Sequence, residues 1–185
     1  MAVVSRERAR EQTAAWREAG ETVVLANGVF DLLHVGHVRY LAGARQLGTR
    51  LIVAVNGDRS ARDHKGAGRP VMAAAERARL VAALRPVDLV VVFEEPTVDR
   101  LIEELRPAVQ AKGTDYRADT VPERATALAH GAAVAITGDA KRHASRELFE
   151  RVRERAAAEV PGRALPKPGV PGDPGRRPPR RDLSR

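Results

Sequence analysis

Two histidines, His34 and His37, lie three residues apart where a predicted strand gives way to a predicted helix. The strand is an apolar, β-branched run, and the helical pattern begins at about Gly36, between the two rings. Residues three apart on a helix are neighbours. A helix N-terminus carries unpaired N–H groups and a partial positive charge, and the imidazoles add donors that can become cationic. The pattern therefore predicts a phosphate site at His34, Gly36 and His37.

Phosphate chemistry explains the histidine pair better than a metal site does. A zinc site would need further His, Cys or carboxylate ligands at suitable spacing, and the chain has no cysteine and no obvious set of such ligands. In nucleotidyl transfer the attacking phosphate is already an anion, so the protein needs no nucleophile of its own. It must align the reactants and neutralise charge that develops on the phosphoryl oxygens. We predict catalytic roles for His34 and His37, and no metal held by the protein.

The residues that close the first strand form a turn just before the histidine pair. Glycine permits a tight turn and a close approach of the backbone to a ligand. An aromatic ring here has core packing as its alternative role, and an aspartate can instead cap the turn with its own side chain. The binding interpretation predicts nucleotide contacts for Asn27, Gly28, Val29 and Phe30, and a substrate contact for Asp31.

A long polar segment, residues 57–70, connects a predicted strand to a predicted helix. Loops of this length are uncommon unless they move or have a function. Lys65, which is followed by a glycine, could swing over the β- and γ-phosphates of a nucleotide as such a loop closes. The alternative is a solvated surface lysine. Because the histidine pair is in the same chain, we predict that Lys65 is catalytic.

Two further segments carry polar groups that suit a nucleotide site. Arg77 lies early in a predicted helix and could reach a ribose or a phosphate, or pair with a carboxylate on the surface. Residues 112–116 follow the fourth predicted strand, and a glycine turn with a cation, a carboxylate and a phenol suits a nucleotide or a sugar hydroxyl. The alternative for this segment is an ordinary loop. We predict nucleotide contacts for Arg77, Lys112 and Gly113, and substrate contacts for Asp115 and Tyr116.

Ser145 lies near the start of the last predicted helix, after a basic stretch that contains Arg142. Its alternative role is to cap that helix. A serine at a second helix N-terminus could also bind the triphosphate, with the basic stretch beside it. We predict a nucleotide contact for Ser145 and a substrate contact for Arg142.

Strands and helices alternate along the chain with short connections, which predicts a parallel sheet covered by helices. Right-handed crossovers then make the fold class α/β, a Rossmann-like, doubly wound and mainly five-stranded parallel sheet with helices on both faces. Ligands of such sheets bind beyond the carboxyl ends of the strands, where the histidine pair lies. The predicted strands are residues 22–27, 51–56, 87–93, 108–111 and 132–136, and the predicted helices are residues 5–18, 36–47, 73–84, 97–105, 122–130 and 144–156.

Composition divides the 185 residues into a folded part, residues 1–159, and a tail, residues 160–185. The tail holds seven of the 12 prolines and a net charge of +5 out of +8, with few large apolar side chains, so we predict that it is disordered. The folded part is only mildly basic, which does not favour a nucleic-acid partner. The chain has no apolar run near the roughly 20 residues that span a membrane, and no signal-peptide pattern, so we predict a cytoplasmic protein.

Together these segments resemble the cytidylyltransferase-like nucleotidyltransferases, and most closely the branch that adenylylates D-glycero-β-D-manno-heptose 1-phosphate in ADP-heptose synthesis. The resemblance covers most of the folded part. Residues 27–37 match the family's Gly-x-Phe-Asp-x-x-His-x-Gly-His pattern, and residues 112–116, Lys-Gly-Thr-Asp-Tyr, are similar to the Lys-Gly-Gly-Asp-Tyr of the heptose branch. Further similar segments are residues 51–58, Lys65-Gly66 with residues 69–71, and Glu76-Arg77.

The resemblance implies an enzyme that transfers AMP from ATP to a sugar phosphate such as heptose 1-phosphate and releases pyrophosphate. It also implies Mg²⁺ with the nucleotide, and a homodimer. One alternative is a CTP-dependent cytidylyltransferase that acts on glycerol 3-phosphate or a similar alcohol phosphate. Another is a nucleotide-binding protein without turnover.

The chain departs from the family at the last predicted helix. The family has a Ser/Thr-rich triplet there, whereas this chain has Ala144, Ser145 and Arg146, with a single hydroxyl. The residues that would bind the triphosphate at the start of this helix therefore differ from the family's pattern.

Overall fold

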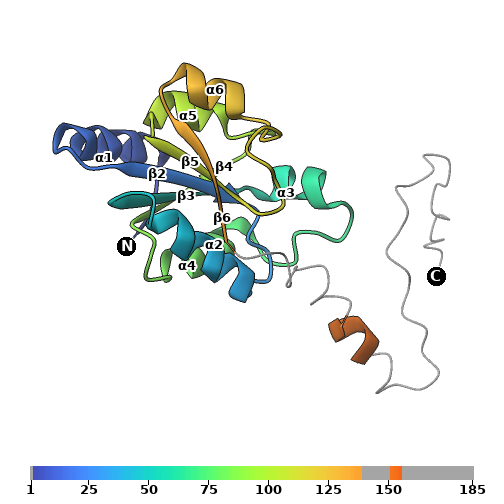
Figure 1. The fold of residues 1–185 in the computed structure, drawn as a ribbon. Helices are drawn as coiled ribbons and strands as arrows, with labels where there is room; N and C mark the ends of the chain where they lie inside the picture. Colours follow the sequence, from blue (N-terminus) through green and yellow to red (C-terminus); the bar gives the residue numbers. More distant parts are fainter. Residues whose placement is uncertain (1, 139–150, 156–185) are drawn as a thin grey trace, which may run out of the picture.

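A parallel sheet of six strands forms the centre of the structure, a computed structural model that describes residues 2–138 and 151–155 (Figure 1). The strand order is β1-β4-β3-β2-β5-β6, and every neighbouring pair is parallel. The strands are β1 (Ala2–Val4), β2 (Val23–Gly28), β3 (Arg50–Asn56), β4 (Leu89–Phe93), β5 (Val109–Gly113) and β6 (Ala133–Thr137).

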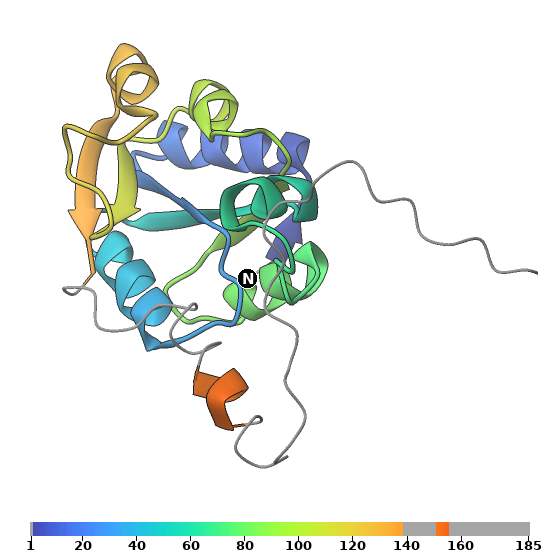
Figure 2. The same cartoon turned by 90° about the vertical axis from the view of Figure 1, so that its right-hand side faces the viewer.

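Helices cover both faces of this sheet (Figures 1 and 2). One face carries α1 (Arg6–Glu18), α5 (Asp99–Leu105) and α6 (Arg124–Ala129), and the other carries α2 (Val35–Arg45) and α4 (Ala74–Ala82). The short helix α3 (Asp58–Lys65) follows the carboxyl end of β3. No helix in the described part of the chain is long and apolar enough to cross a membrane.

Strand alternation divides the core into two layers. Val24 and Ala26 of β2 pack toward α2 and α4, whereas Val23 and Leu25 pack toward α1, α5 and α6. Successive side chains of a strand point to opposite faces, so a central strand covered on both faces must be apolar throughout. All four side chains are completely buried. This explains why the first predicted strand reads as a continuous apolar run.

The structure confirms the α/β fold with its parallel sheet and corrects two details. The sheet has six strands rather than five, because residues 2–4 pair with β4 as β1. Three residues are too few to show a strand's alternation. Residues 57–70 are not one long loop, because α3 begins at Asp58. This helix buries only Ser60 and Ala61, so it lacks the apolar stripe that identifies a helix in a sequence.

Four predictions fall partly or wholly outside the described residues. Of the last predicted helix, residues 151–155 are described and are helical. Arg142 and Ser145 lie outside the described residues, and so does the predicted disordered tail, residues 160–185. The roles predicted for them remain predictions.

The direction of chain growth reverses beside β2. After β2 the chain adds β3 and β4 on one side through α2, α3 and α4, and it then returns to add β5 and β6 on the other side through α5 and α6. The connections that leave β2 and β5 therefore run to opposite faces of the sheet. In open α/β sheets such a reversal opens a crevice at the carboxyl ends of the two strands, where ligands bind.

Gly48, in the turn between α2 and β3, offers a test of the packing. A Cβ at this position would lie 2.5 Å from the carbonyl oxygen of Thr22 and 2.7 Å from Cγ2 of Val24. Gly48→Ala is expected to lower the free energy of unfolding by about 1–3 kcal/mol, because the buried backbone and side chain must shift. Urea unfolding measures the change. Gly113→Ala is the control, because a Cβ there meets no atom within 4 Å; equal losses in both variants would contradict the packing explanation.

Candidate active site at the carboxyl ends of β2 and β5

His34 and His37 cap the N-terminus of α2 reciprocally. His34 is the N-cap residue, and its Nδ1 accepts a hydrogen bond from the N–H of Gly36 at 3.1 Å. Nδ1 of His37 accepts from the N–H of His34 at 3.3 Å. An imidazole nitrogen that accepts carries no proton, so in each neutral ring the proton is on Nε2. The cap therefore fixes both tautomers and makes each Nε2 a donor.

The two rings stack with their centroids 3.9 Å apart, and this arrangement affects the charge of His37. Burial, together with the neighbouring His34 and Lys65, lowers the pKa of His37 to about 4, against the opposing effect of Asp31 and Asp115. His37 is therefore neutral at pH 7 in the protein without ligand. Its contribution there is a neutral N–H donor rather than a positive charge.

This pKa predicts how stability depends on pH. A folded-state pKa of about 4 against an ordinary value of 6.5 means that the unfolded chain binds more protons between these pH values. The free energy of unfolding should therefore fall as the pH drops from 6.5 to 4, and the contribution of His37 should be absent above 6.5. Urea unfolding at several pH values measures this slope. His37→Asn should make the slope shallower, and an identical slope would contradict the assignment.

The buried ring of Phe30 packs against His37. Its side chain is only 3% exposed, and its ring lies 5.3 Å from that of His37 and 6.3 Å from that of Tyr40, centroid to centroid. A Cβ on Gly28 would lie 3.2 Å from the Phe30 ring, so the glycine leaves room for it. Phe30 and Leu32 have φ angles of 53° and 50°, which cost energy in residues other than glycine. The Phe30 side chain thus lies in the core, and the nucleotide contact predicted for this residue remains a prediction.

Tyr40 and Gln110 connect the strands on either side of the crevice. The hydroxyl of Tyr40 donates to the carbonyl oxygen of Ala111 at 2.9 Å and lies 3.4 Å from that of Asn27. Nε2 of Gln110 donates to Oδ1 of Asn27 at 3.0 Å. Burial raises the pKa of Tyr40, so its hydroxyl remains a neutral donor. Sequence reasoning missed Tyr40, although its position three residues after His37 places it one helical turn along the same helix.

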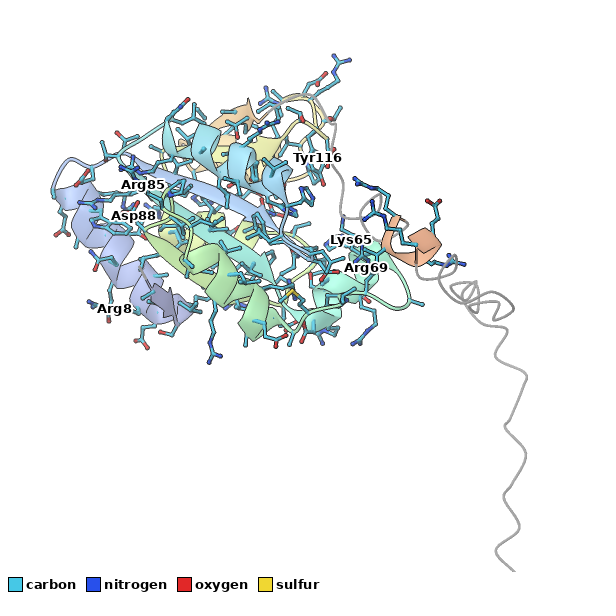
Figure 3. The ribbon with its side chains drawn as sticks, turned by 90° about the horizontal axis from the view of Figure 1, so that it is seen from below. Arg8, Lys65, Arg69, Arg85, Asp88 and Tyr116 are labelled. Atoms are coloured by element: carbon cyan, nitrogen blue, oxygen red, sulfur yellow. The ribbon has the colours of Figure 1, made fainter. Side chains whose placement is uncertain are left out.

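Lys65 is the last residue of α3, and its side chain is exposed. It lies near enough to His37 for its charge to lower that residue's pKa. Figure 3 shows Lys65, Arg69 and Tyr116 at one end of the molecule, with Arg85 and Asp88 at the opposite end. Lys65 therefore lies at the same end as the crevice, as the predicted catalytic role requires.

Asp31 and Arg77 hold the backbone around the crevice. The Asp31 carboxylate is 3% exposed and accepts from Nη1 of Arg69 and from the N–H groups of Val71 and Met72. Arg77 is completely buried and pairs with Asp58 at 2.9 Å. Arg77 thus forms an ion pair with a carboxylate, although it is buried rather than on the surface, and its nucleotide contact remains a prediction. The substrate contact of Asp31 remains a prediction.

A buried ion pair joins the end of β5 to the start of α6. Nζ of Lys112 lies 2.9 Å from Oε2 of Glu123, and both side chains are almost completely buried. Lys112 Nζ also lies 5.2 Å from the ring centroid of Tyr116, which is 40% exposed, and burial raises the pKa of that phenol. Lys112 thus supports the turn from inside, while Tyr116 reaches the surface. Sequence reasoning missed Glu123 because no local pattern marks a partner eleven residues away.

The structure brings together part of the predicted site. The pKa of His37 is affected by His34, Asp31, Lys65 and Asp115, so residues of three separate segments lie near this ring. Arg77 and Lys112 are buried and form ion pairs with Asp58, which is 45% exposed, and with the buried Glu123; their nucleotide contacts remain predictions. Gly28, Val29, Gly36 and Gly113 lie in or beside the turns that border the crevice.

A parallel α/β sheet with a histidine-capped helix beside its switch point defines a Rossmann-like domain suited to bind phosphate groups. Comparison with known families agrees, because residues 25–156 match the family described as Cytidylyltransferase-like. The chain belongs to this family, as its motifs led us to expect. Fold and family together make it a domain of the nucleotidyltransferase class.

Several curated relatives carry the name "Bifunctional protein HldE". The protein from Magnetococcus marinus is 54% identical over 113 residues, which are 61% of this chain and 23% of that relative. The protein from Syntrophotalea carbinolica is 42% identical over 150 residues, which are 81% of this chain and 31% of that relative. The chain thus spans about a quarter to a third of the length of these relatives.

Two solved structures share the fold. The lipopolysaccharide core biosynthesis protein from Thermoplasma volcanium is 27% identical with a TM-score of 0.58, and the match covers 66% of this chain and all of that chain. Pantothenate synthetase from Thermus thermophilus has a TM-score of 0.57 over 84% of this chain and 71% of that chain. At 19% identity the second match shows the fold alone.

Proposed function

We propose that this protein transfers AMP from ATP to the phosphate of a sugar phosphate similar to heptose 1-phosphate. An oxygen of the sugar phosphate attacks the α-phosphorus of ATP, the bond from that phosphorus to the β-phosphate breaks, and pyrophosphate leaves. The observation that carries the proposal is the reciprocal cap of His34 and His37, which presents two Nε2 donors beside a helix N-terminus at the crevice.

The two histidines act as hydrogen-bond donors toward phosphate oxygens. Negative charge shifts during transfer, and donors fixed in advance stabilise it without having to reorganise. The backbone bonds to both Nδ1 atoms hold the rings in place before substrate arrives. His37 is neutral, so it binds the phosphate by a hydrogen bond and can gain further from the developing charge.

Lys65 supplies the positive charge that the neutral His37 lacks. Its side chain is exposed at the end of α3, near His37, so it can approach a triphosphate held on the histidines. We propose that it neutralises the leaving pyrophosphate. An ammonium on a flexible stem suits this role because it can follow a phosphate as the phosphate moves.

Mg²⁺ is proposed to arrive with the nucleotide. Among the residues that the structure describes, no group of three or more His, Asp or Glu side chains could hold a metal ion. Phosphate oxygens would therefore be its main ligands, and the ion would supply charge neutralisation. No step of the proposed reaction depends on a metal site made by the protein alone.

The sugar phosphate is proposed from two supports. Residues 112–116 resemble the heptose branch of the family, and the relatives with 42–54% identity share the name HldE. The turn formed by these residues borders the crevice on the β5 side, with Tyr116 at the surface. Asp115 and Tyr116 are proposed to bind sugar hydroxyls.

Pyrophosphate release from a panel of substrate pairs tests the proposal. We expect release with ATP and heptose 1-phosphate, and at most slow release when CTP replaces ATP or glycerol 3-phosphate replaces the sugar. Faster release with CTP and glycerol 3-phosphate would replace the proposal by the cytidylyltransferase alternative. Binding of ATP without release from any pair would instead support the non-enzyme. Sedimentation of the full chain tests the proposed homodimer.

A further inference from the structure

Arg77 carries a permanent positive charge although its side chain is completely buried. Every arm of its guanidinium has a partner: Nε donates to the carbonyl oxygen of Met72 at 2.9 Å, Nη1 to that of Val29, and Nη2 to Oδ1 of Asp58 at 2.9 Å. A buried charge is tolerated only when it is paired and its donors are bonded. Three of its five N–H groups are thus bonded, and because the side chain is completely buried, Arg77 could turn toward a nucleotide only by breaking these bonds.

The three partners of Arg77 belong to three segments that are far apart in the sequence. Val29 lies in the connection that leads from β2 to the histidine pair, and it precedes Phe30, whose ring lies against His37. Asp58 is the first residue of α3, and Met72 precedes α4. Arg77 thus connects the segment that carries the histidines to the helix that carries Lys65.

Asp58 fixes the orientation of α3 through two bonds. Its Oδ1 accepts from Arg77 and also from the N–H of Ala74 at 2.8 Å. A helix of eight residues is about 12 Å long, so an anchor at one end contributes to the position of the other. Lys65 is that other end.

The segment beyond Lys65 gives it little support. Gly66 and Gly68 have φ angles of 87° and 79°, and a Cβ on either glycine would meet no atom within 4 Å. The next firm anchor is at residues 69–72, which Asp31 binds. Within α3, the Ser60 hydroxyl donates to the carbonyl oxygen of Glu95 at 3.1 Å, and Nε2 of His64 lies 2.9 Å from that of Pro96, so these contacts hold α3 against the segment after β4. Asp58 is the contact that holds α3 to Arg77, and through Arg77 to the segment that carries the histidines.

We propose that Asp58 and Arg77 are a positioning pair, which holds α3 so that Lys65 stays beside His37 while neither residue touches substrate. The expected effect of this pair on turnover rests on the proposed function. The geometric claim concerns the protein without ligand, and it can be tested separately.

The test compares Asp58→Ala with Asp58→Asn by NMR titration of His37 in the full chain without ligand. Both variants remove the negative charge, but only alanine removes the oxygen that accepts from Arg77 and Ala74. Loss of a nearby carboxylate cannot raise the pKa of a histidine. We expect Asp58→Ala to raise the pKa of His37 by about 0.5–1 unit, because Lys65 moves away. Asp58→Asn should leave it close to the wild-type value.

A double variant identifies the source of the shift. Lys65→Gln alone should raise the pKa of His37, since it removes a cation that lowers it. In the Asp58→Ala/Lys65→Gln protein we expect no further rise, because both changes remove the same charge from the same place. Additive shifts, or equal titrations of His37 in Asp58→Ala and Asp58→Asn, would overturn the proposal.

Turnover provides the second measurement. We expect Asp58→Ala to lower kcat by about 10-fold with a smaller change in KM, as misplacement of a catalytic group does. Asp63→Ala removes a carboxylate from an exposed position on the same helix and should leave kcat unchanged. If Asp58→Ala does not fold, Asp58→Ser makes the same comparison, because its short hydroxyl cannot reach both donors. A His37 shift without measurable turnover in the wild-type chain would leave the positioning pair standing and remove only the proposed reaction.

Discussion

A His37→Ala variant is expected to release pyrophosphate about 10²–10³-fold more slowly than the wild-type chain, which is the usual cost of removing one preorganised donor. The variant should remain folded. The ring is only partly buried, and its bond to the N–H of His34 is one helix cap, which contributes about 1 kcal/mol. Steady-state pyrophosphate release measures the first effect and urea unfolding measures the second.

Two conservative substitutions show which atom of His37 acts. Nδ1 is bonded to the backbone, so the donor toward substrate is Nε2. The amide nitrogen of glutamine reaches about as far as Nε2, whereas that of asparagine reaches about as far as Nδ1. We expect His37→Gln to keep more of kcat than His37→Asn. The reverse order would contradict the tautomer assigned here, and normal release by His37→Ala would remove His37 from the mechanism.

His130→Ala is the control for these variants. His130 is the C-cap residue of α6, which precedes β6 and therefore lies toward the amino end of that strand. It should have wild-type turnover. A comparable loss in His130→Ala would mean that the effect of His37→Ala reflects a general disturbance of the fold.

Lys65→Ala is expected to lower kcat by about 10²-fold, because it removes the cation proposed to meet the leaving pyrophosphate. Lys65 is exposed and lies at the end of a helix, so the free energy of unfolding should change by less than about 0.5 kcal/mol. Lys65→Arg keeps the charge and should recover part of kcat. Separate measurement of kcat and KM distinguishes a transition-state effect from weaker binding.

Arg62→Ala is the matched control for Lys65→Ala. Arg62 is an exposed cation on the same helix, one turn earlier. If turnover required only a positive charge anywhere on this helix, both variants would lose turnover to the same extent. An unchanged rate in Lys65→Ala would mean that Lys65 is a solvated surface residue without a catalytic role.

The sequence by itself predicted the parallel sheet and the position of the histidine pair. Strands β2, β3, β4 and β6 contain apolar or β-branched runs, because a strand covered on both faces must be apolar along its length. His34 and His37 follow β2 directly, and the carboxyl end of a strand is where such sheets bind ligands. Both inferences depend on residues close together in the chain, so local patterns were sufficient.

Only the tertiary structure decided which charged residues reach the crevice. The sequence does not distinguish Arg77 and Lys112 from Lys65, because all three are cations near predicted strand ends or helix starts. In the structure, however, Arg77 and Lys112 are buried and pair with Asp58 and Glu123. The burial of a charge depends on partners brought near by folding: Val29 is 48 residues from Arg77, and Asp58 is 19 residues from it. The pKa of His37 likewise reflects three segments at once. Residue type and spacing can therefore predict where a site lies, whereas the charge and the accessibility of its members depend on contacts that exist only in the folded chain.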